Sequence, residues 1–149
     1  MNLNNIIFKN ETINYDVLFN FLKDCDKLIM PVLSSVVDIK EYSKKLVNNA
    51  TFYSAVDNEN LIAIIVCYAN NFKTKEAFIT MVAVKLEYQK KHLATMLFQN
   101  CIEDLKNKGF KKISLEVHCE NLKAIKLYEK FNFKIIHLKE KMLYMQRSI

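Results

Sequence analysis

Apolar positions along this chain follow two different periods, and the change from one to the other separates predicted helices from predicted strands. In residues 15–28 and 39–47 apolar side chains return every three or four positions, which predicts helices with one apolar face. The first of these faces comprises Val17, Leu18, Phe21, Leu22 and Leu28. Pro31 interrupts the helical pattern between the two segments, so residues 30–38 are predicted to form a loop.

The pattern shortens to that of strands in the middle of the chain. Residues 51–57 and 61–69 are rich in β-branched and aromatic residues, and the polar turn 57–60 between them predicts a hairpin. Residues 76–84 alternate very little, which is typical of a strand covered on both faces. Residues 5–10 form a short candidate strand near the N-terminus.

Helices and strands alternate in the remainder. A helix over 93–105 repeats an apolar residue every fourth position, at Leu93, Leu97, Cys101 and Leu105. Gly109, the only glycine of the chain, is placed to end this helix in a left-handed conformation. Residues 111–118 then form a predicted strand, with Ile113, Leu115 and Val117 on one face.

A last helix is predicted to begin at Asn121, whose side chain suits an N-cap. Its apolar positions are Ala124, Leu127, Tyr128 and Phe131. Residues 133–138 and 141–146 complete the chain as a pair of strands. The order β-α-α-β-β-β-α-β-α-β-β predicts an α/β fold in which helices are layered on a sheet.

Composition narrows the class of protein. With 149 residues, 51% hydrophobic and 26% charged, the chain is predicted to be one globular domain, residues 1–149. No apolar run reaches the ~20 residues of a membrane span, so no membrane partner is expected. Residues 1–11 lack the pattern of a signal peptide, which predicts a cytoplasmic protein.

The four cysteines, Cys25, Cys67, Cys101 and Cys119, have no metal-ligand spacing. They are predicted to be reduced, and no metal site is expected. The net charge of +6 is compatible with a nucleic acid, an anionic cofactor or an anionic substrate, but the lysines are spread along the chain. Charge alone therefore does not select a partner.

Two motifs carry the chemistry. The first is Gln89-Lys90-Lys91-His92-Leu93-Ala94, between the strand 76–84 and the following helix. The second comprises Asn121, Ala124, Leu127, Tyr128, Asn132 and Phe133. Together they resemble the Q/R-x-x-G-x-G/A loop and the N-x-x-A-x-x-L/F-Y-x-x-x-G-F signature of the Gcn5-related N-acetyltransferase (GNAT) superfamily. The resemblance covers about residues 51–146, and the second motif is its more specific half.

The resemblance implies a GNAT-like fold, with a mixed, mostly antiparallel central sheet of about six to seven strands flanked by four helices. It also implies acetyl-CoA as the acyl donor. Backbone amides at a helix N-terminus would hold the pyrophosphate, here at Gln89, Lys90, Lys91, His92, Leu93, Ala94 and Thr95. The backbone of Val82, Ala83 and Val84 would pair with the pantetheine arm, and Asn121 and Ala124 would complete the cofactor site.

Two residues depart from the family pattern. His92 and Asn132 stand where the two motifs have glycine. If the backbone at residue 92 is helical, a side chain is tolerated, whereas a left-handed backbone would be strained. Lys90 and Lys91 could compensate by pairing with phosphate.

The resemblance assigns Tyr128 as the general acid that protonates the departing thiolate. The acceptor amine must also lose a proton, and Glu116, His118 or a water chain are the candidates for that base. Thr80 on the central strand could position such a water.

The sequence therefore predicts an acetyl-CoA-dependent N-acetyltransferase that moves an acetyl group directly to a primary amine. The acceptor is a small molecule, such as an amino sugar nucleotide, or a peptide. Its site would lie at about residues 21–43 and 138–144, with Tyr42, Tyr68, Phe72 and Tyr144 as candidate lining. The protein would be a monomer or a homodimer, in which the strand 141–146 could pair with a second copy.

Two other functions are weighed against this one. A GNAT-like domain could bind CoA or a partner without turnover, and His92 is the feature that favours it. A basic module could bind nucleic acid through Lys90, Lys91, Lys111 and Lys112. The sequence has no recognised nucleic-acid-binding signature, so no nucleic-acid partner is expected.

Overall fold

A computed structural model describes residues 3–149, so residues 1–2 of the predicted domain lie outside the described part. Its helices are α1 (Tyr15–Cys25), α2 (Ile39–Asn49), α3 (Leu93–Asn107) and α4 (Leu122–Lys130). Its strands are β1 (Ile6–Lys9), β2 (Thr51–Asp57), β3 (Asn60–Tyr68), β4 (Glu76–Val84), β5 (Lys112–His118), β6 (Lys134–Lys139) and β7 (Met142–Ser148). The predicted number and order of helices and strands are confirmed.

The strands form one sheet in the order β1-β2-β3-β4-β5-β7-β6. Every neighbouring pair is antiparallel except β4 and β5, which run parallel. This is the mixed, mostly antiparallel sheet predicted from the sequence. Strand β7 lies inside the sheet and β6 at its edge, so the prediction that residues 141–146 could pair with a second copy is wrong. Both sides of β7 are already occupied by neighbouring strands.

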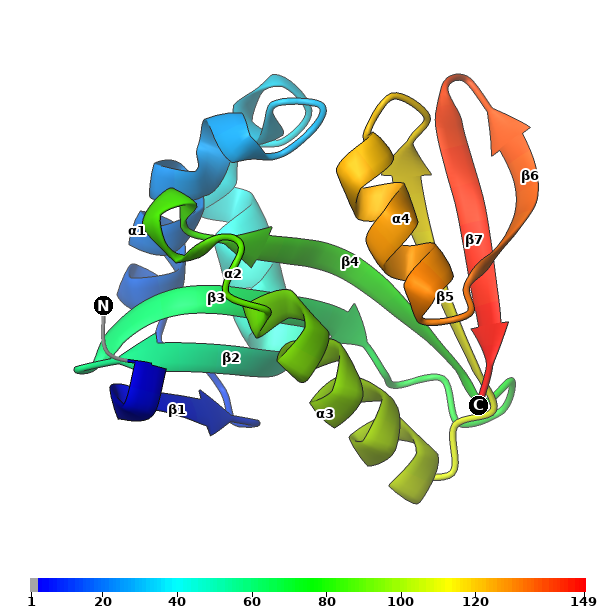
Figure 1. Cartoon of the computed structure of the whole chain (residues 1–149), viewed down its shortest axis with the longest axis horizontal. Helices are drawn as coiled ribbons and strands as arrows, with labels where there is room; N and C mark the ends of the chain where they lie inside the picture. Colours follow the sequence, from blue (N-terminus) through cyan, green and yellow to red (C-terminus); the bar gives the residue numbers. More distant parts are fainter. Residues whose placement is uncertain (1–2) are drawn as a thin grey trace.

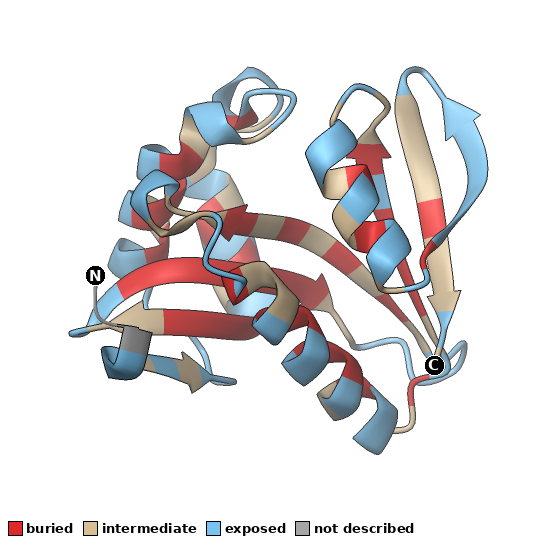
Figure 2. Cartoon of the chain, viewed as in Figure 1, coloured by how far each residue is buried: buried red, intermediate tan, exposed pale blue. Residues whose placement is uncertain are grey.

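Helices cover the sheet from both sides (Figure 1). One buried cluster joins α1 and α2 to β2–β4, through residues such as Leu18, Leu46 and Phe52. A second joins α3 and α4 to the opposite face and extends to β5 and β7. Figure 2 shows that the buried residues lie on the inner faces of the helices and along the central strands.

Two expectations from the apolar pattern are wrong. Val17 and Leu28 are 45% and 41% exposed and do not belong to the buried face of α1. Leu28 lies beyond the end of α1, because the chain tightens into a short 3₁₀-helix at Asp26–Leu28. Strand β4 is not fully covered either, since buried and half-buried side chains alternate along it.

An irregularity in β4 changes which face its buried side chains reach. The register with β3 shifts between Ile79 and Met81, so Thr80 is an extra residue in β4. Ala77 and Ile79 therefore pack on the α3 side, whereas Met81 and Ala83 pack on the α1 and α2 side.

Gly109 and Asn121 mark the end of α3 and the start of α4, as the sequence predicts. Gly109 has φ 90°, and the amide of Phe110 donates to the carbonyl of Leu105, which closes α3. The side chain of Asn121 accepts a hydrogen bond from the amide of Ala124 at 3.3 Å, which caps α4. Within residues 3–149, no helix is long and apolar enough to cross a membrane.

Candidate active site

A cavity of about 890 Å³ opens between two neighbouring strands of the sheet. Strands β4 and β5 pair only from Glu76–Lys112 to Ile79–Leu115 and then diverge (Figure 1). Beyond Ile79, β4 has no strand partner on the β5 side. Residues from both strands line the cavity, and so do the segment 27–37, the loop before α3 and the first turns of α4.

The predicted cofactor residues gather on one side of this cavity. Val82, Ala83 and Val84 line it from β4, where the missing strand partner leaves backbone groups that an extended ligand could pair with. Gln89, Lys90, His92, Leu93, Ala94, Thr95, Asn121 and Ala124 also line it. Lys91 is exposed and does not. The residues present therefore fit an elongated, anionic ligand such as acetyl-CoA.

The loop before α3 adopts the strained alternative considered from the sequence. His92 is the N-cap residue of α3 and has φ 62°, and Lys90 has φ 63°. A residue other than glycine costs roughly 1–2 kcal/mol in this left-handed region. Asn132, in the second glycine position, is also left-handed, with φ 66°. Asparagine tolerates this conformation better than most residues.

Lys123 is a site residue that the sequence reasoning missed. Its Nζ donates to Oε1 of Gln89 at 3.1 Å, and Nε2 of Gln89 donates to the carbonyl of Val84 at 3.2 Å. Gln89 thus connects the end of β4 with the start of α4 across the cavity. The signal available was the position of Lys123, which directly precedes Ala124 of the second motif.

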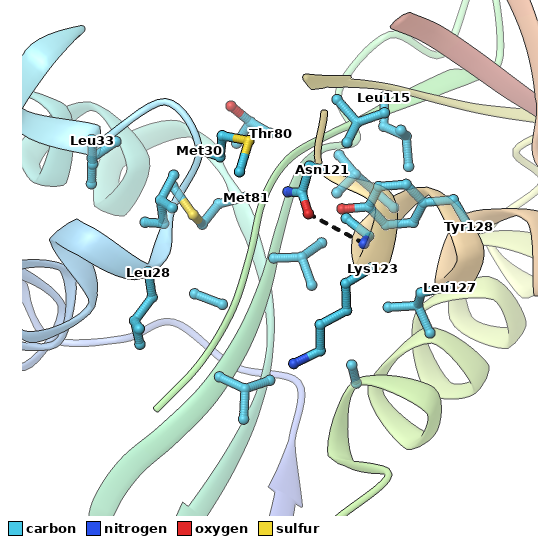
Figure 3. Close-up of a pocket in the computed structure, with 18 of the residues that line it drawn as sticks. Leu28, Met30, Leu33, Thr80, Met81, Leu115, Asn121, Lys123, Leu127 and Tyr128 are labelled. Atoms are coloured by element: carbon cyan, nitrogen blue, oxygen red, sulfur yellow. Dashed lines mark hydrogen bonds between the residues drawn. The ribbon is translucent and has the colours of Figure 1, made fainter. Parts of the chain in front are cut away.

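Tyr128 projects from α4 into the cavity (Figure 3). It is 7% exposed and packs edge-to-face with the Phe98 ring, with ring centroids 5.7 Å apart. Burial raises the pKa of Tyr128 to about 12, so the phenol stays protonated at neutral pH. A protonated hydroxyl beside the cavity can donate a proton to a leaving group.

The two candidate bases, Glu116 and His118, lie differently relative to the cavity. Glu116 lines the cavity from β5, whereas His118 does not line it. His118 lies at the end of β5, where its Nδ1 accepts a hydrogen bond from the amide of Glu120 at 3.1 Å. Thr80 lines the cavity, and its Oγ1 lies 3.1 Å from the hydroxyl of Tyr42.

The four predicted aromatic residues of the acceptor site do not gather in one place. Tyr42 lines the cavity. Tyr68 and Phe72 line a separate hollow beside residues 70–76. Tyr144 lines neither, and its hydroxyl donates to Glu76 at 3.0 Å. The opposite wall of the cavity is instead apolar, with Leu28, Met30 and Leu33 on the side away from α4 (Figure 3).

Comparisons with known proteins agree with this geometry. The sequence profile of the acetyltransferase (GNAT) family matches residues 18–133. N-alpha-acetyltransferase 30 of Schizosaccharomyces pombe is 30% identical over 116 residues, which cover 76% of this chain and 77% of that protein. The chain therefore belongs to the GNAT acetyltransferase family.

Solved structures share the fold at low sequence identity. The PaiA N-acetyltransferase of Thermoplasma acidophilum, in complex with coenzyme A, superimposes with a TM-score of 0.76 at 17% identity, covering 96% of this chain and 99% of that one. The ribosomal-protein-S18-alanine N-acetyltransferase of Escherichia coli has a TM-score of 0.71 at 18% identity, covering 96% of this chain and 94% of that one. The seven-stranded sheet with four helices is thus a GNAT fold.

Proposed function

We propose that this protein is an acetyl-CoA-dependent N-acetyltransferase whose acceptor is the α-amine at the N-terminus of a polypeptide. The observation that carries the proposal is the single cavity between β4 and β5. It joins the loop before α3 to the segment 27–37, and Tyr128 lines it. A donor bound on one side and an acceptor bound on the other would meet beside this phenol.

The residues at the meeting point suit direct transfer. Acetyl-CoA supplies a thioester, whose carbon–sulfur bond breaks as the acceptor nitrogen bonds to the acetyl carbon. Tyr128 donates its phenolic proton to the departing sulfur. Glu116, which lines the cavity, accepts the proton that the nitrogen loses, directly or through a water near Thr80. We favour Glu116 over His118 as this base because only Glu116 reaches the cavity.

The choice of a polypeptide acceptor rests on two supports. One relative is an N-alpha-acetyltransferase, and one protein of the same fold is named for an alanine of a ribosomal protein. An amino sugar nucleotide would bring phosphates to the acceptor side. There, Lys27 is the one basic residue of the segment 27–37.

The basic-module alternative finds little support. Lys90 precedes α3 and Lys111 follows it, so the 15 residues of that helix separate them. At 1.5 Å per residue this is about 22 Å. These lysines therefore form no single patch.

The test combines binding and turnover. Purified full-length protein is titrated with acetyl-CoA by calorimetry and then assayed with N-terminal peptides for thiol release and for the mass of the product. Tyr128→Phe should lower kcat about 10²- to 10⁴-fold and leave the affinity for acetyl-CoA unchanged. Tyr15→Phe, at the half-buried first position of α1 and outside the cavity lining, is the matched control and should change neither.

Each negative outcome has a distinct meaning. Absence of acetyl-CoA binding would overturn the proposal. Binding without turnover on any amine would instead support the domain without catalysis, for which the left-handed His92 is the structural argument. Full activity of Tyr128→Phe would remove this residue from the mechanism.

A further inference from the structure

The segment between α1 and α2 carries no charge over ten residues. Residues 28–37 read LIMPVLSSVV, between Lys27 and Asp38. Four of its large apolar side chains are exposed: Leu28, Met30, Val32 and Val36 at 41%, 45%, 39% and 60%. A cluster of exposed apolar side chains is typical of a surface that binds a ligand or a partner.

Hydrogen bonds and packing hold this segment in place. Leu33 is 3% exposed and belongs to the core cluster under α1 and α2. The amide of Ser34 donates to Oδ1 of Asp26 at 2.7 Å, and the amide of Val37 donates to the carbonyl of Leu33 at 3.1 Å. With Leu33 anchored in the core, Leu28, Met30 and Val36 line the acceptor side of the cavity as an apolar wall.

The strand residues across from this wall offer few polar groups. Met81 from β4 and Met142 from β7 line the same cavity. The hydroxyls of Tyr42 and Thr80 are 3.1 Å apart and share one hydrogen bond. Glu116 is the acidic residue among the described cavity-lining residues. The acceptor side therefore offers one carboxylate near the reacting amine and apolar side chains around it.

We propose that the apolar wall, defined as Leu28, Met30 and Val36, binds the side chain of the acceptor's first residue and selects a large, flexible apolar one, methionine or leucine. This inference rests on the proposed function and adds the class of N-terminus. A side chain of that size fills a space bounded by methionines and aliphatic residues, whose shapes adapt to it. A small or charged first residue leaves the wall exposed to water or has its charge desolvated.

The experiment measures the preference for the first residue. The full-length protein acetylates peptides that differ only at position one: methionine, leucine, alanine, serine or aspartate. Methionine and leucine peptides should exceed the serine peptide in kcat/KM by ~10- to 200-fold, the range typical of apolar pockets. Met30→Ser and Val36→Ser should reduce this ratio by about tenfold or more, because only the large apolar first residue depends on contacts with the wall.

Val17→Ser is the matched control, because Val17 is as exposed as Met30, at 45%, but lies on α1 and does not line the cavity. It should leave the ratio unchanged. A serine or alanine peptide acetylated as well as the methionine peptide overturns this inference and leaves the proposed function standing. Acetylation of none of the peptides overturns both.

A second copy of the chain is the competing occupant of the apolar wall. If Met30→Ser lowers the molecular mass in solution and leaves the peptide ratio unchanged, the wall is a contact between copies. That result also overturns the inference.

Discussion

His92 shows how one residue sets the character of the candidate cofactor site. It occupies a position where the family motif has glycine, and its backbone is left-handed as a glycine's would be. The conformation is adopted although the side chain opposes it, because the chain turns into α3 directly after this residue. The strain is therefore stored at the start of α3, beside the candidate cofactor residues of the cavity.

Replacing His92 with glycine should stabilise the protein. Removing the side chain relieves roughly 1–2 kcal/mol of left-handed strain in the folded protein. The greater freedom of glycine in the unfolded chain lowers the free energy of unfolding by about 0.4–1 kcal/mol. We expect a net gain of about 0.5–1 kcal/mol in the free energy of unfolding. Urea denaturation monitored by circular dichroism measures it.

His92→Ala is the control for this prediction, since it removes the imidazole but keeps the Cβ that causes the strain. It should give no gain. Equal stabilisation by both variants would show that the imidazole, and not the backbone, is responsible.

Individual residues were predictable to different degrees. The positions of Tyr128 and His92 followed from motif spacing, but whether residue 92 is helical or left-handed depends on how the chain leaves β4. Lys123 was missed because its partner, Gln89, is 34 positions away in the sequence. Contacts of this kind depend on tertiary placement and leave no local pattern.

At the scale of elements, α4 positions the proposed acid. The cap at Asn121 fixes where the helix begins, and Tyr128 follows two turns later on the buried face. Asn121→Ala should remove this cap and lower the free energy of unfolding by about 1 kcal/mol. Because Tyr128 then sits on a frayed helix, kcat should fall as well. Urea denaturation and the peptide assay measure the two effects.

Asn121→Ser keeps a side-chain oxygen that can cap the helix, so its stability should stay within a few tenths of a kcal/mol of the wild type. If alanine and serine lower the stability equally, the cap does not hold α4 in place.

Element boundaries were largely predictable because local chemistry sets them. Gly109 ends α3 and Asn121 begins α4 through hydrogen bonds within a few residues. The extra residue Thr80 in β4 was not predictable, because the register of a strand is defined only against its partner. The divergence of β4 from β5, which creates the cavity, depends on the sheet as a whole.

At the scale of the whole molecule, one buried layer of side chains lies on each face of the sheet that contains the cavity. The layer on the side of α3 and α4 contains two buried tyrosines, Tyr53 and Tyr128. Tyr53 packs between β2 and α3, where burial and then its 2.5 Å hydrogen bond to Asp104 raise its pKa far above the ordinary value. Burial raises the pKa of Tyr128 to about 12. In the unfolded chain both phenols titrate near pH ~10.

These raised values give the protein a definite sensitivity to alkali. Between pH ~10 and about 12 the unfolded state has lost the phenolic protons that the folded state retains, so rising pH favours unfolding. Below pH ~10 both states are protonated and this contribution to stability is fully present. Each such phenol should lower the free energy of unfolding by about 1.4 kcal/mol per pH unit in that window.

Urea denaturation from pH 8 to pH ~11.5, with tyrosinate absorbance recorded in parallel, tests this linkage in wild type, Tyr128→Phe and Tyr53→Phe. Each variant should lose one phenol's share of the alkaline slope. All other titratable groups are the same in the three proteins, so their contribution cancels in the comparison. An unchanged slope in Tyr128→Phe would mean that its phenol ionises in the folded protein as readily as in the unfolded chain, and the proposed acid would then not be held protonated by burial.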